Sequence, residues 1–286
     1  MTNGSLFSGI GGMDKGADDA GIKTKYFVEK EPYFRYILKK RFPGTLIYED
    51  IKRINPCELP DTDILSGGFP CQDISQAKPN GLGLLGIESG LWDYYLNIIT
   101  IKKPKYVFIE NVANIRTKGL STIRRQLTSL GYVGWHRRIS ARQFGFPDRR
   151  WRIFIVAANS DSIGCKKMEI FDKKFSEILL EKAKMQTLSS NELAGISGGE
   201  FWSEVYPRIV RIDNGFSNPM ERIRGLGNAV KPILAEMIYR TIIEFDKFIN
   251  NKIDNEVEIE AIEVKSIEEL LKYLESVYRN KYELYY

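Results

Sequence analysis

The sequence predicts an α/β fold in which a parallel β-sheet carries helices on both faces. Short apolar runs alternate with amphipathic stretches from the N-terminus to about residue 158, which is the pattern of strands and connecting helices. The chain has 286 residues, of which 43% are hydrophobic, enough for one large domain with a substantial core. Parallel sheets bind ligands beyond the carboxyl ends of their strands, so we expect the functional residues directly after the apolar runs.

The order of the expected elements follows from the apolar spacing. Strands are expected at residues 5–7, 26–28, 64–66, 106–109 and 152–158, and helices at 13–20, 33–42, 91–101 and 122–130. Residues 160–206 break this pattern, with 6 basic and 8 acidic side chains, and suggest a small separate lobe or a large insertion. An amphipathic helix is expected over 229–248, with Pro232 in its first turn, and a further helix over 267–282.

Charge is concentrated in one region of the chain. The net charge is +5, yet residues 102–152 alone hold 13 basic and 2 acidic side chains. Such a block predicts a polyanionic partner whose phosphates are neutralised by Lys and Arg, although solvated basic helix faces are the alternative. No apolar run is long enough to span a membrane, and no signal-like stretch begins the chain, so an intracellular protein is expected.

Cysteine and histidine are scarce, which limits the possible chemistry. Three Cys without paired spacing and a single His argue against a zinc centre, and no metal is expected. A Ser-His-Asp hydrolase would have to use His136, and no G-x-S-x-G turn accompanies it. Cys71 differs from the other two cysteines because it follows Gly67-Gly68 at a strand end, where a thiolate nucleophile would face the ligand crevice. A buried, inert thiol is the alternative.

Glycines and acids follow the first strands. Gly9, Gly11 and Gly12 stand between a strand and a helix, where the backbone can approach a ligand closely. Glu29 ends the second strand and suits a ribose, and Asp50 ends the next apolar stretch and suits an exocyclic amine. Each is an ordinary turn or surface acid when taken alone, but their order suggests a cofactor that contains adenosine.

Two later segments carry further polar groups. Glu110 and Asn111 end a strand, which is unusual for a buried run, although exposure would explain them equally. Arg150 and Arg152 lead into the last expected strand and point to the same face, because strand periodicity is two.

Taken in order, these segments resemble the DNA cytosine-5 methyltransferase family. The resemblance rests on Leu6–Gly12, Glu29, Asp50, Gly68–Gln72, Glu110–Val112, Gln143–Val156 and Gly225–Pro232. The sequence departs from the usual pattern at Ser5, where an Asp is usual, and at Asp148, where a Gln is usual.

The resemblance implies a Rossmann-like S-adenosylmethionine-dependent methyltransferase fold with a small target-recognition lobe. It implies S-adenosyl-L-methionine as cofactor, S-adenosyl-L-homocysteine as product and no metal. The implied cofactor-binding residues are Phe7, Ser8, Gly9, Ile10, Gly11, Gly12, Glu29, Lys30, Asp50, Ile51, Gly68, Pro70, Leu91, Asn228, Ala229 and Val230.

The implied reaction methylates C5 of a cytosine that is flipped out of double-stranded DNA. Cys71 would attack C6, Glu110 would donate to N3 and Arg152 would hold O2. Asn111 would fix the loop of Pro70, Cys71 and Gln72, and Arg150 would support the pocket.

The resemblance also divides the chain into parts and implies its setting. Residues 1–159 would form the catalytic and cofactor-binding domain, 160–224 the target-recognition lobe, 225–248 a helix that completes the cofactor domain, and 249–286 a helical tail of unknown role. A cytoplasmic monomer of a bacterial or phage-infected cell, without a membrane partner, is expected. Two alternatives stay open, a tRNA cytosine-5 methyltransferase and a degenerate relative that binds DNA without turnover.

Overall fold

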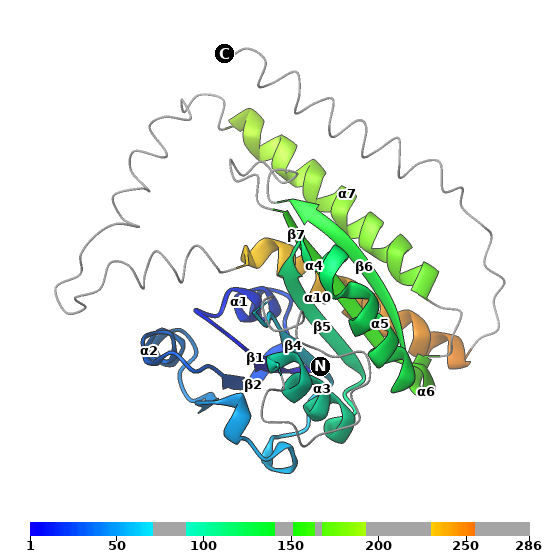
Figure 1. Cartoon of the computed structure of the whole chain (residues 1–286). Helices are drawn as coiled ribbons and strands as arrows, with labels where there is room; N and C mark the ends of the chain where they lie inside the picture. The colour runs from blue at the N-terminus through cyan, green and yellow to red at the C-terminus, as the bar shows by residue number, and fades with distance from the viewer. Residues whose placement is uncertain (71–89, 141–150, 164–167, 193–229, 255–286) are drawn as a thin grey trace.

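A seven-stranded mixed sheet forms the centre of the computed structural model, which describes residues 1–70, 90–140, 151–163, 168–192 and 230–254 (Figure 1). The strands are β1 (Thr2–Leu6), β2 (Lys23–Val28), β3 (Leu46–Tyr48), β4 (Ile64–Gly67), β5 (Tyr106–Val112), β6 (Tyr132–Ser140) and β7 (Trp151–Asn159). Their order across the sheet is β3-β2-β1-β4-β5-β7-β6. The architecture confirms the expected α/β class.

One strand departs from the expected parallel arrangement. β7 runs antiparallel to both of its neighbours, β5 and β6, whereas the pairs β1–β2, β1–β4, β2–β3 and β4–β5 are parallel. β7 follows β6 after residues 141–150 and returns beside it, so it enters the sheet between β5 and β6. As a result, the start of β7 lies beside the end of β5, where Arg152 is paired with Val112.

Helices cover both faces of the sheet, as the alternating pattern predicts (Figure 1). They are α1 (Gly12–Asp19), α2 (Pro32–Arg41), α3 (Leu91–Lys102), α4 (Ile115–Lys118), α5 (Leu120–Ser129), α6 (Ser160–Ile163), α7 (Met168–Glu192) and α10 (Pro232–Asp254), with 3₁₀ turns η1 (Ile51–Arg53) and η2 (Pro56–Glu58). Residues of α1, α7 and α10 pack in one hydrophobic cluster with the sheet, and residues of α3, α4 and α5 pack in a second cluster.

The first cluster joins segments that are far apart in the chain. α10 begins at Pro232, where a missing backbone N–H is tolerated, and its Tyr239 meets the Phe108 ring of β5 edge-on at 5.0 Å. α10 also packs closely on α1, because a Cβ atom on Gly16 would lie 2.6 Å from the backbone nitrogen of Glu236. The late helix is thereby part of the same body as the first strand and helix.

The lobe expected over residues 160–224 is described only in its first part. Phe171 and Phe175 of α7 are fully buried and pack against Trp135 of β6, with ring centroids 5.1 and 5.0 Å apart. α7 therefore covers the sheet, while the residues from 193 to 229 lie outside the described part of the chain. The helix expected over 267–282 and most of the tail over 249–286 also lie outside it.

Candidate functional site

The turn between β1 and α1 has an unusual backbone. Phe7, Gly9 and Gly11 have φ angles of 53°, 56° and 80°, in the left-handed region that favours glycine. Phe7 is one of two non-glycine residues with positive φ in the described part of the chain, and such conformations concentrate at functional sites. The turn opens α1, whose first residue is Gly12, so the first backbone N–H groups of the helix lie at the end of the turn.

The C-terminal part of the described chain meets this turn. A Cβ atom on Gly12 would lie 2.5 Å from the carbonyl oxygen of Val230, so the absence of a side chain allows this contact. Val230 is buried and lies two residues before Pro232, the first residue of α10. Two expected cofactor residues from opposite ends of the chain are therefore in contact, while their companions Asn228 and Ala229 lie outside the described residues.

Glu29 holds the turn from the end of β2. Its carboxylate accepts hydrogen bonds from the backbone N–H of Gly9 at 2.6 Å and of Glu31 at 2.8 Å. The side chain is buried, and this burial raises the pKa of the carboxyl group despite those hydrogen bonds. Glu29 thus fixes the glycine turn and offers a carboxylate next to it.

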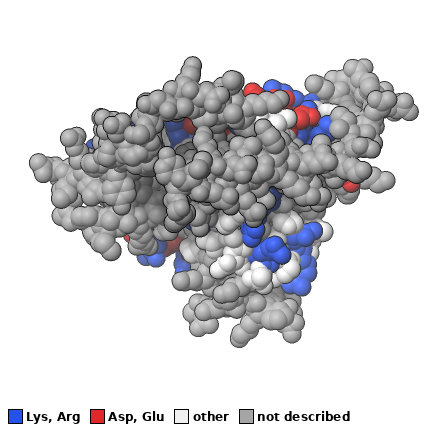
Figure 2. All heavy atoms as spheres, turned by 90° about the horizontal axis from the view of Figure 1, so that it is seen from above, with Lys and Arg blue, Asp and Glu red and all other residues white. Residues whose placement is uncertain are grey.

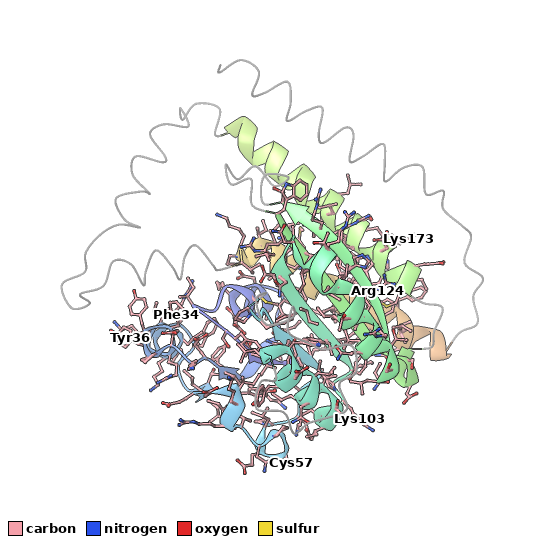
Figure 3. The ribbon with its side chains drawn as sticks, viewed as in Figure 1. Phe34, Tyr36, Cys57, Lys103, Arg124 and Lys173 are labelled. Carbon is pink, nitrogen blue, oxygen red and sulfur yellow. The ribbon has the colours of Figure 1, made fainter. Side chains whose placement is uncertain are left out.

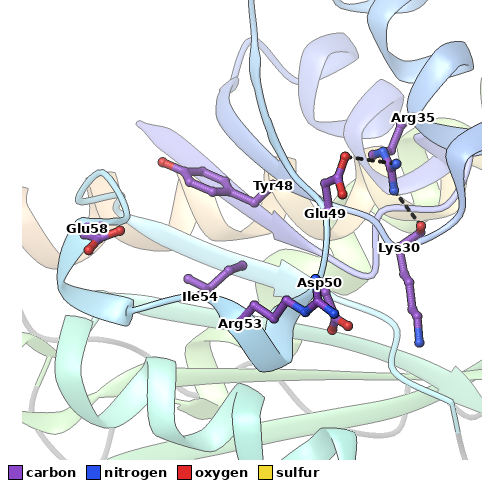
Figure 4. Close-up of a pocket in the computed structure, with 8 residues that line it drawn as sticks. All are labelled: Lys30, Arg35, Tyr48, Glu49, Asp50, Arg53, Ile54 and Glu58. Atoms are coloured by element: carbon purple, nitrogen blue, oxygen red, sulfur yellow. Dashed lines mark hydrogen bonds and ion pairs between the residues drawn. The ribbon is translucent and has the colours of Figure 1, made fainter.

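A pocket of about 370 Å³ lies where β2 and β3 end (Figure 4). Its lining residues are Lys30, Arg35, Tyr48, Glu49, Asp50, Arg53, Ile54 and Glu58. Arg35 forms an ion pair with Glu49 at 3.1 Å and donates a hydrogen bond to the carbonyl oxygen of Lys30 at 2.5 Å. Lys30 and Asp50, two of the expected cofactor residues, therefore face the same pocket.

Asp50 and the expected cofactor residues Ile51, Leu91 and Ile10 are each held by contacts of their own. Asp50 caps η1 by accepting a hydrogen bond from the N–H of Lys52 at 3.0 Å, and Ile51 behind it is buried. Leu91 begins α3 and packs, like Phe7, against the second hydrophobic cluster. Ile10 is held through its carbonyl oxygen, which accepts a hydrogen bond from Arg41 at 3.0 Å.

A second group of residues gathers where β4 and β5 end. The parallel pairing of these strands aligns Gly67 with Ile109, so the residues that follow each strand are neighbours. Asn111 donates a hydrogen bond from Nδ2 to the carbonyl oxygen of Phe69 at 2.9 Å, and Asn111 is buried. The Phe69 ring lies 5.2 Å from that of Trp92, between centroids, and is buried. The chain that leads into Pro70 is thus anchored by backbone and side chain.

Glu110 and Arg152 form an ion pair beside this anchor. Nε of Arg152 lies 2.7 Å from Oε1 of Glu110, and the two side chains are only 13% and 12% exposed. A Cβ atom on Gly68 would lie 2.7 Å from Oε2 of Glu110, so the glycine leaves room for the carboxylate. Phe69, Glu110 and Arg152 therefore meet at one edge of the sheet although they come from three different strands or strand ends. Cys71, Gln72 and Arg150 lie outside the described residues, and the described cysteine, Cys57, is exposed in η2 (Figure 3).

A buried acid under the glycine turn was not among the expected site residues. Asp14 of α1 is fully enclosed, with Oδ2 3.1 Å from the hydroxyl of Ser5 and Oδ1 3.3 Å from that of Thr24. Burial raises its pKa to about 7, against the opposing effect of the hydrogen bonds from Ser5 and Thr24. No local sequence pattern marks it, because Asp14 is buried beside Met13 and Ala17 only where the distant helix α10 packs on α1.

A cationic face adjoins the second group of residues. The segment from residue 111 to 140 holds six Lys or Arg side chains and no Asp or Glu. Arg137 is paired with Asp172 of α7 at 3.6 Å, so the cationic face consists of Arg116, Arg124 and Arg138. Arg124 extends from α5 (Figure 3), and together with Arg116 and the larger effect of burial it lowers the pKa of His136. At the start of β7 the guanidinium of Arg138 lies 4.3 Å from the ring centroid of Trp151, which is 38% exposed. Figure 2 shows Lys and Arg side chains gathered on part of the described surface.

Two absences hold for the part of the chain that the structure describes. No helix among those residues is long and apolar enough to cross a membrane. Those residues also contain no group of three or more His, Cys, Asp or Glu side chains that could hold a metal ion.

Comparison with known proteins identifies a family and several relatives. The family model of the C-5 cytosine-specific DNA methylases matches residues 1–215. The type II methyltransferase M2.BsuMI of Bacillus subtilis (strain 168) is 36% identical over 208 residues, which cover 70% of this chain and 51% of that protein. The type II methyltransferase M.HaeII of Haemophilus aegyptius is 36% identical over 155 residues, 53% of this chain and 48% of that protein.

A solved structure shows a weaker likeness. The Dnmt2 methyltransferase of S. pombe is 23% identical, with a TM-score of 0.47 over 55% of this chain and 50% of that chain. The matches span about half the length of the curated relatives. The family model, which covers most of the chain, decides the assignment: the chain belongs to the C-5 cytosine-specific DNA methylase family.

Proposed function

We propose that this protein transfers a methyl group from S-adenosyl-L-methionine to C5 of a cytosine flipped out of double-stranded DNA. The observation that carries the proposal is a pair of contacts near the carboxyl ends of β4 and β5. Glu110 forms an ion pair with Arg152, and Asn111 holds the carbonyl oxygen of Phe69. Cys71 follows Phe69 and Pro70 directly in the chain, so this anchor supports its role as the nucleophile. The family of the chain supports the same reaction.

The glycine turn and the pocket beside it are proposed to hold the cofactor. Glu29 would accept hydrogen bonds from the ribose hydroxyls, and Asp50 and Ile51 would contact the adenine. Gly9, whose Cβ position faces open space, would let the rest of the molecule approach the backbone of the turn. When bound, S-adenosylmethionine supplies the electrophilic methyl group of its sulfonium and leaves as S-adenosylhomocysteine.

The catalytic residues would act in sequence on the extruded base. The Cys71 thiolate adds to C6, which breaks the C5–C6 double bond and drives electron density toward N3 and O2. Glu110, when protonated, donates its proton to N3, and Arg152 stabilises the developing charge at O2. C5 would then form its bond to the methyl group, the C5 proton would be lost to a base, and elimination of the Cys71 thiolate would restore the C5–C6 double bond as N3 returns its proton to Glu110. Asn111, through Phe69, holds the nucleophile's loop, with Gln72 and Arg150 in supporting positions.

The partner is proposed to be duplex DNA, held in part by the cationic face. Arg116, Arg124 and Arg138 carry no ion pair among the described residues and would neutralise phosphates. Residues from 160 to 224 are proposed to contribute target recognition. The type II methyltransferases that match the chain support a place in restriction and modification of DNA. The cytoplasmic location and the monomeric state stay predictions.

Methyl transfer from radiolabelled S-adenosylmethionine to unmethylated genomic DNA, with bisulfite sequencing of the product, tests the proposal. We expect 5-methylcytosine from the wild type, none from Cys71→Ser, and wild-type activity from the matched control Cys57→Ser, since Cys57 is exposed in η2. Cys71→Ser should keep salt-dependent binding to duplex DNA.

Covalent trapping separates the alternatives. Duplex DNA that contains 5-fluorocytosine should form a stable adduct with the wild type in the presence of cofactor, because C5 then has no proton to lose. Binding without an adduct would support a non-catalytic DNA-binding relative, and methyl transfer to tRNA in place of DNA would support the RNA alternative.

A further inference from the structure

A chain of side-chain oxygens runs from Asp14 to the glycine turn. Oδ2 of Asp14 lies 3.1 Å from Oγ of Ser5, and Oγ of Ser5 lies 2.9 Å from Oγ of Ser8. The hydroxyl of Ser8 in turn lies 3.2 Å from the carbonyl oxygen of Ser5 and 3.5 Å from that of Val28. Ser8 belongs to the turn itself, because its carbonyl oxygen accepts the hydrogen bond from the N–H of Gly11 at 2.9 Å.

The other groups around Asp14 do not lead to the glycine turn, so the Ser5–Ser8 hydrogen bonds are its connection to that turn. Oδ1 accepts from the Thr24 hydroxyl at 3.3 Å and from Nδ2 of Asn3 at 3.5 Å. Tyr239 of α10 is the other titratable group that faces Asp14, and its phenol is fully buried. Lys15, the next residue of α1, is exposed and pairs with Asp18 and Asp19.

We propose that Asp14 is a positioning residue whose carboxyl group sets the direction of the Ser5–Ser8 hydrogen bonds and thereby holds the glycine turn in the conformation that receives the cofactor. This inference rests on the proposed role of the turn in binding S-adenosylmethionine.

Proton counting shows why the state of Asp14 matters. Each hydroxyl has one proton to donate. When Asp14 is neutral, its O–H donates to Ser5, Ser5 donates to Ser8, and Ser8 donates to the carbonyl oxygen of Ser5, so each of these three contacts, at 3.1, 2.9 and 3.2 Å, is a hydrogen bond. When Asp14 is ionised, Ser5 must donate to the carboxylate. Ser8 then has a single proton for two acceptors, Oγ and the carbonyl oxygen of Ser5, and the turn loses one hydrogen bond.

This change in hydrogen bonding occurs near neutral pH, because burial raises the pKa of Asp14 to about 7. Cofactor affinity should therefore fall as the pH rises through 7. The loss of one hydrogen bond corresponds to roughly a two- to tenfold change in affinity. Glu29 is the second carboxyl group at this turn, through the N–H of Gly9, so its effect has to be separated from that of Asp14.

Isothermal titration of S-adenosylhomocysteine between pH 5.5 and 8.5 tests the proposal. Asp14→Asn should bind with nearly constant affinity, because its amide always donates toward Ser5 as the neutral acid does. Glu29→Gln should bind more weakly at every pH and keep the wild-type slope. Asp18→Asn, the matched control on the exposed side of α1, should follow the wild type, since Asp18 is 66% exposed. A wild-type profile that is flat, or one that Asp14→Asn leaves unchanged, would overturn the proposal.

A second measurement keeps this result separate from the proposed function. If neither the wild type nor any variant binds S-adenosylhomocysteine at any pH, the cofactor assignment fails. Amide hydrogen exchange at Gly9 and Gly11 then tests, without any cofactor, whether Asp14 holds the glycine turn. The ratio of wild-type to Asp14→Asn exchange rates should rise by roughly two- to tenfold between pH 6 and 8. An unchanged ratio contradicts the role of Asp14.

Discussion

Replacing the buried Asp14 by Asn should stabilise the protein in a pH-dependent way. The folded state raises the pKa of this carboxyl from 3.8 to about 7 by burial. The folded protein therefore keeps the proton between these pH values while the unfolded chain releases it, so the free energy of unfolding falls as the pH rises from about 4 to 7 and is constant above. At about 1.4 kcal/mol per pH unit, the full loss is about 4 kcal/mol. Asn cannot ionise and escapes this loss.

Urea denaturation of both proteins at pH 4, 5.5, 7 and 8 measures the difference. The stability of Asp14→Asn relative to the wild type should increase by about 4 kcal/mol between the lowest and highest pH. Other carboxyls with raised pKa, such as those of Glu29 and Asp93, are present in both proteins and cancel in the difference. Asp18→Asn serves as the control on the same helix. A difference that does not vary with pH would refute the view that Asp14 is buried and neutral at low pH.

Three further predictions concern the edge where β4, β5 and β7 meet and the cationic face beside it. Arg152→Met should lower the free energy of unfolding by about 3–5 kcal/mol, because it leaves the buried Glu110 carboxylate without its partner. The double variant Arg152→Met, Glu110→Gln should be near neutral. Equal losses in the single and double variants, measured by urea denaturation, would contradict a coupled pair. Gly68→Ala should reduce the rate of methyl transfer at least about tenfold, since its Cβ would lie 2.7 Å from the Glu110 carboxylate; unaltered turnover in the radiolabel assay would count against this packing. Arg138→Gln should lower the slope of log affinity for duplex DNA against log salt by about one, and Trp151→Ala should weaken binding without changing that slope; fluorescence anisotropy titrations that show neither effect would remove this face from the DNA contact.

The sequence predicted the central strands because each is a short apolar run. β4, β5 and β7 are buried on both faces, and such strands are visible as continuous hydrophobic stretches. β3 is not predicted as a strand because it has only three residues, at the sheet edge, and none of them is buried. β6 escaped recognition because His136, Arg137 and Arg138 interrupt its apolar residues, although Tyr132 and Trp135 are buried.

α7 was missed for a different reason. Its buried residues Phe171, Phe175, Ile178 and Leu179 have the spacing of one helix face, which the sequence displays. The balanced charge of the surrounding segment suggested a separate lobe instead. These residues cover the sheet next to β6, and the expected lobe over 160–224 stays a prediction.

The sequence predicts those residues of the candidate site that stand at the ends of strands, and it does not predict the others. Glu29 and Glu110 could be placed because each ends a strand, and parallel pairing brings such ends to one edge. Asp14 carries no such label: it is a helix residue, and it becomes a buried acid only when α10, from more than 200 residues along the chain, covers it with Tyr239. The free-energy cost of burying Asp14 depends on a distant helix that excludes water from it, so the local sequence pattern does not show this cost. A buried polar group under a ligand-binding turn is therefore identified by what the core encloses, and Asp14 is such a group, connected to the turn through Ser5 and Ser8.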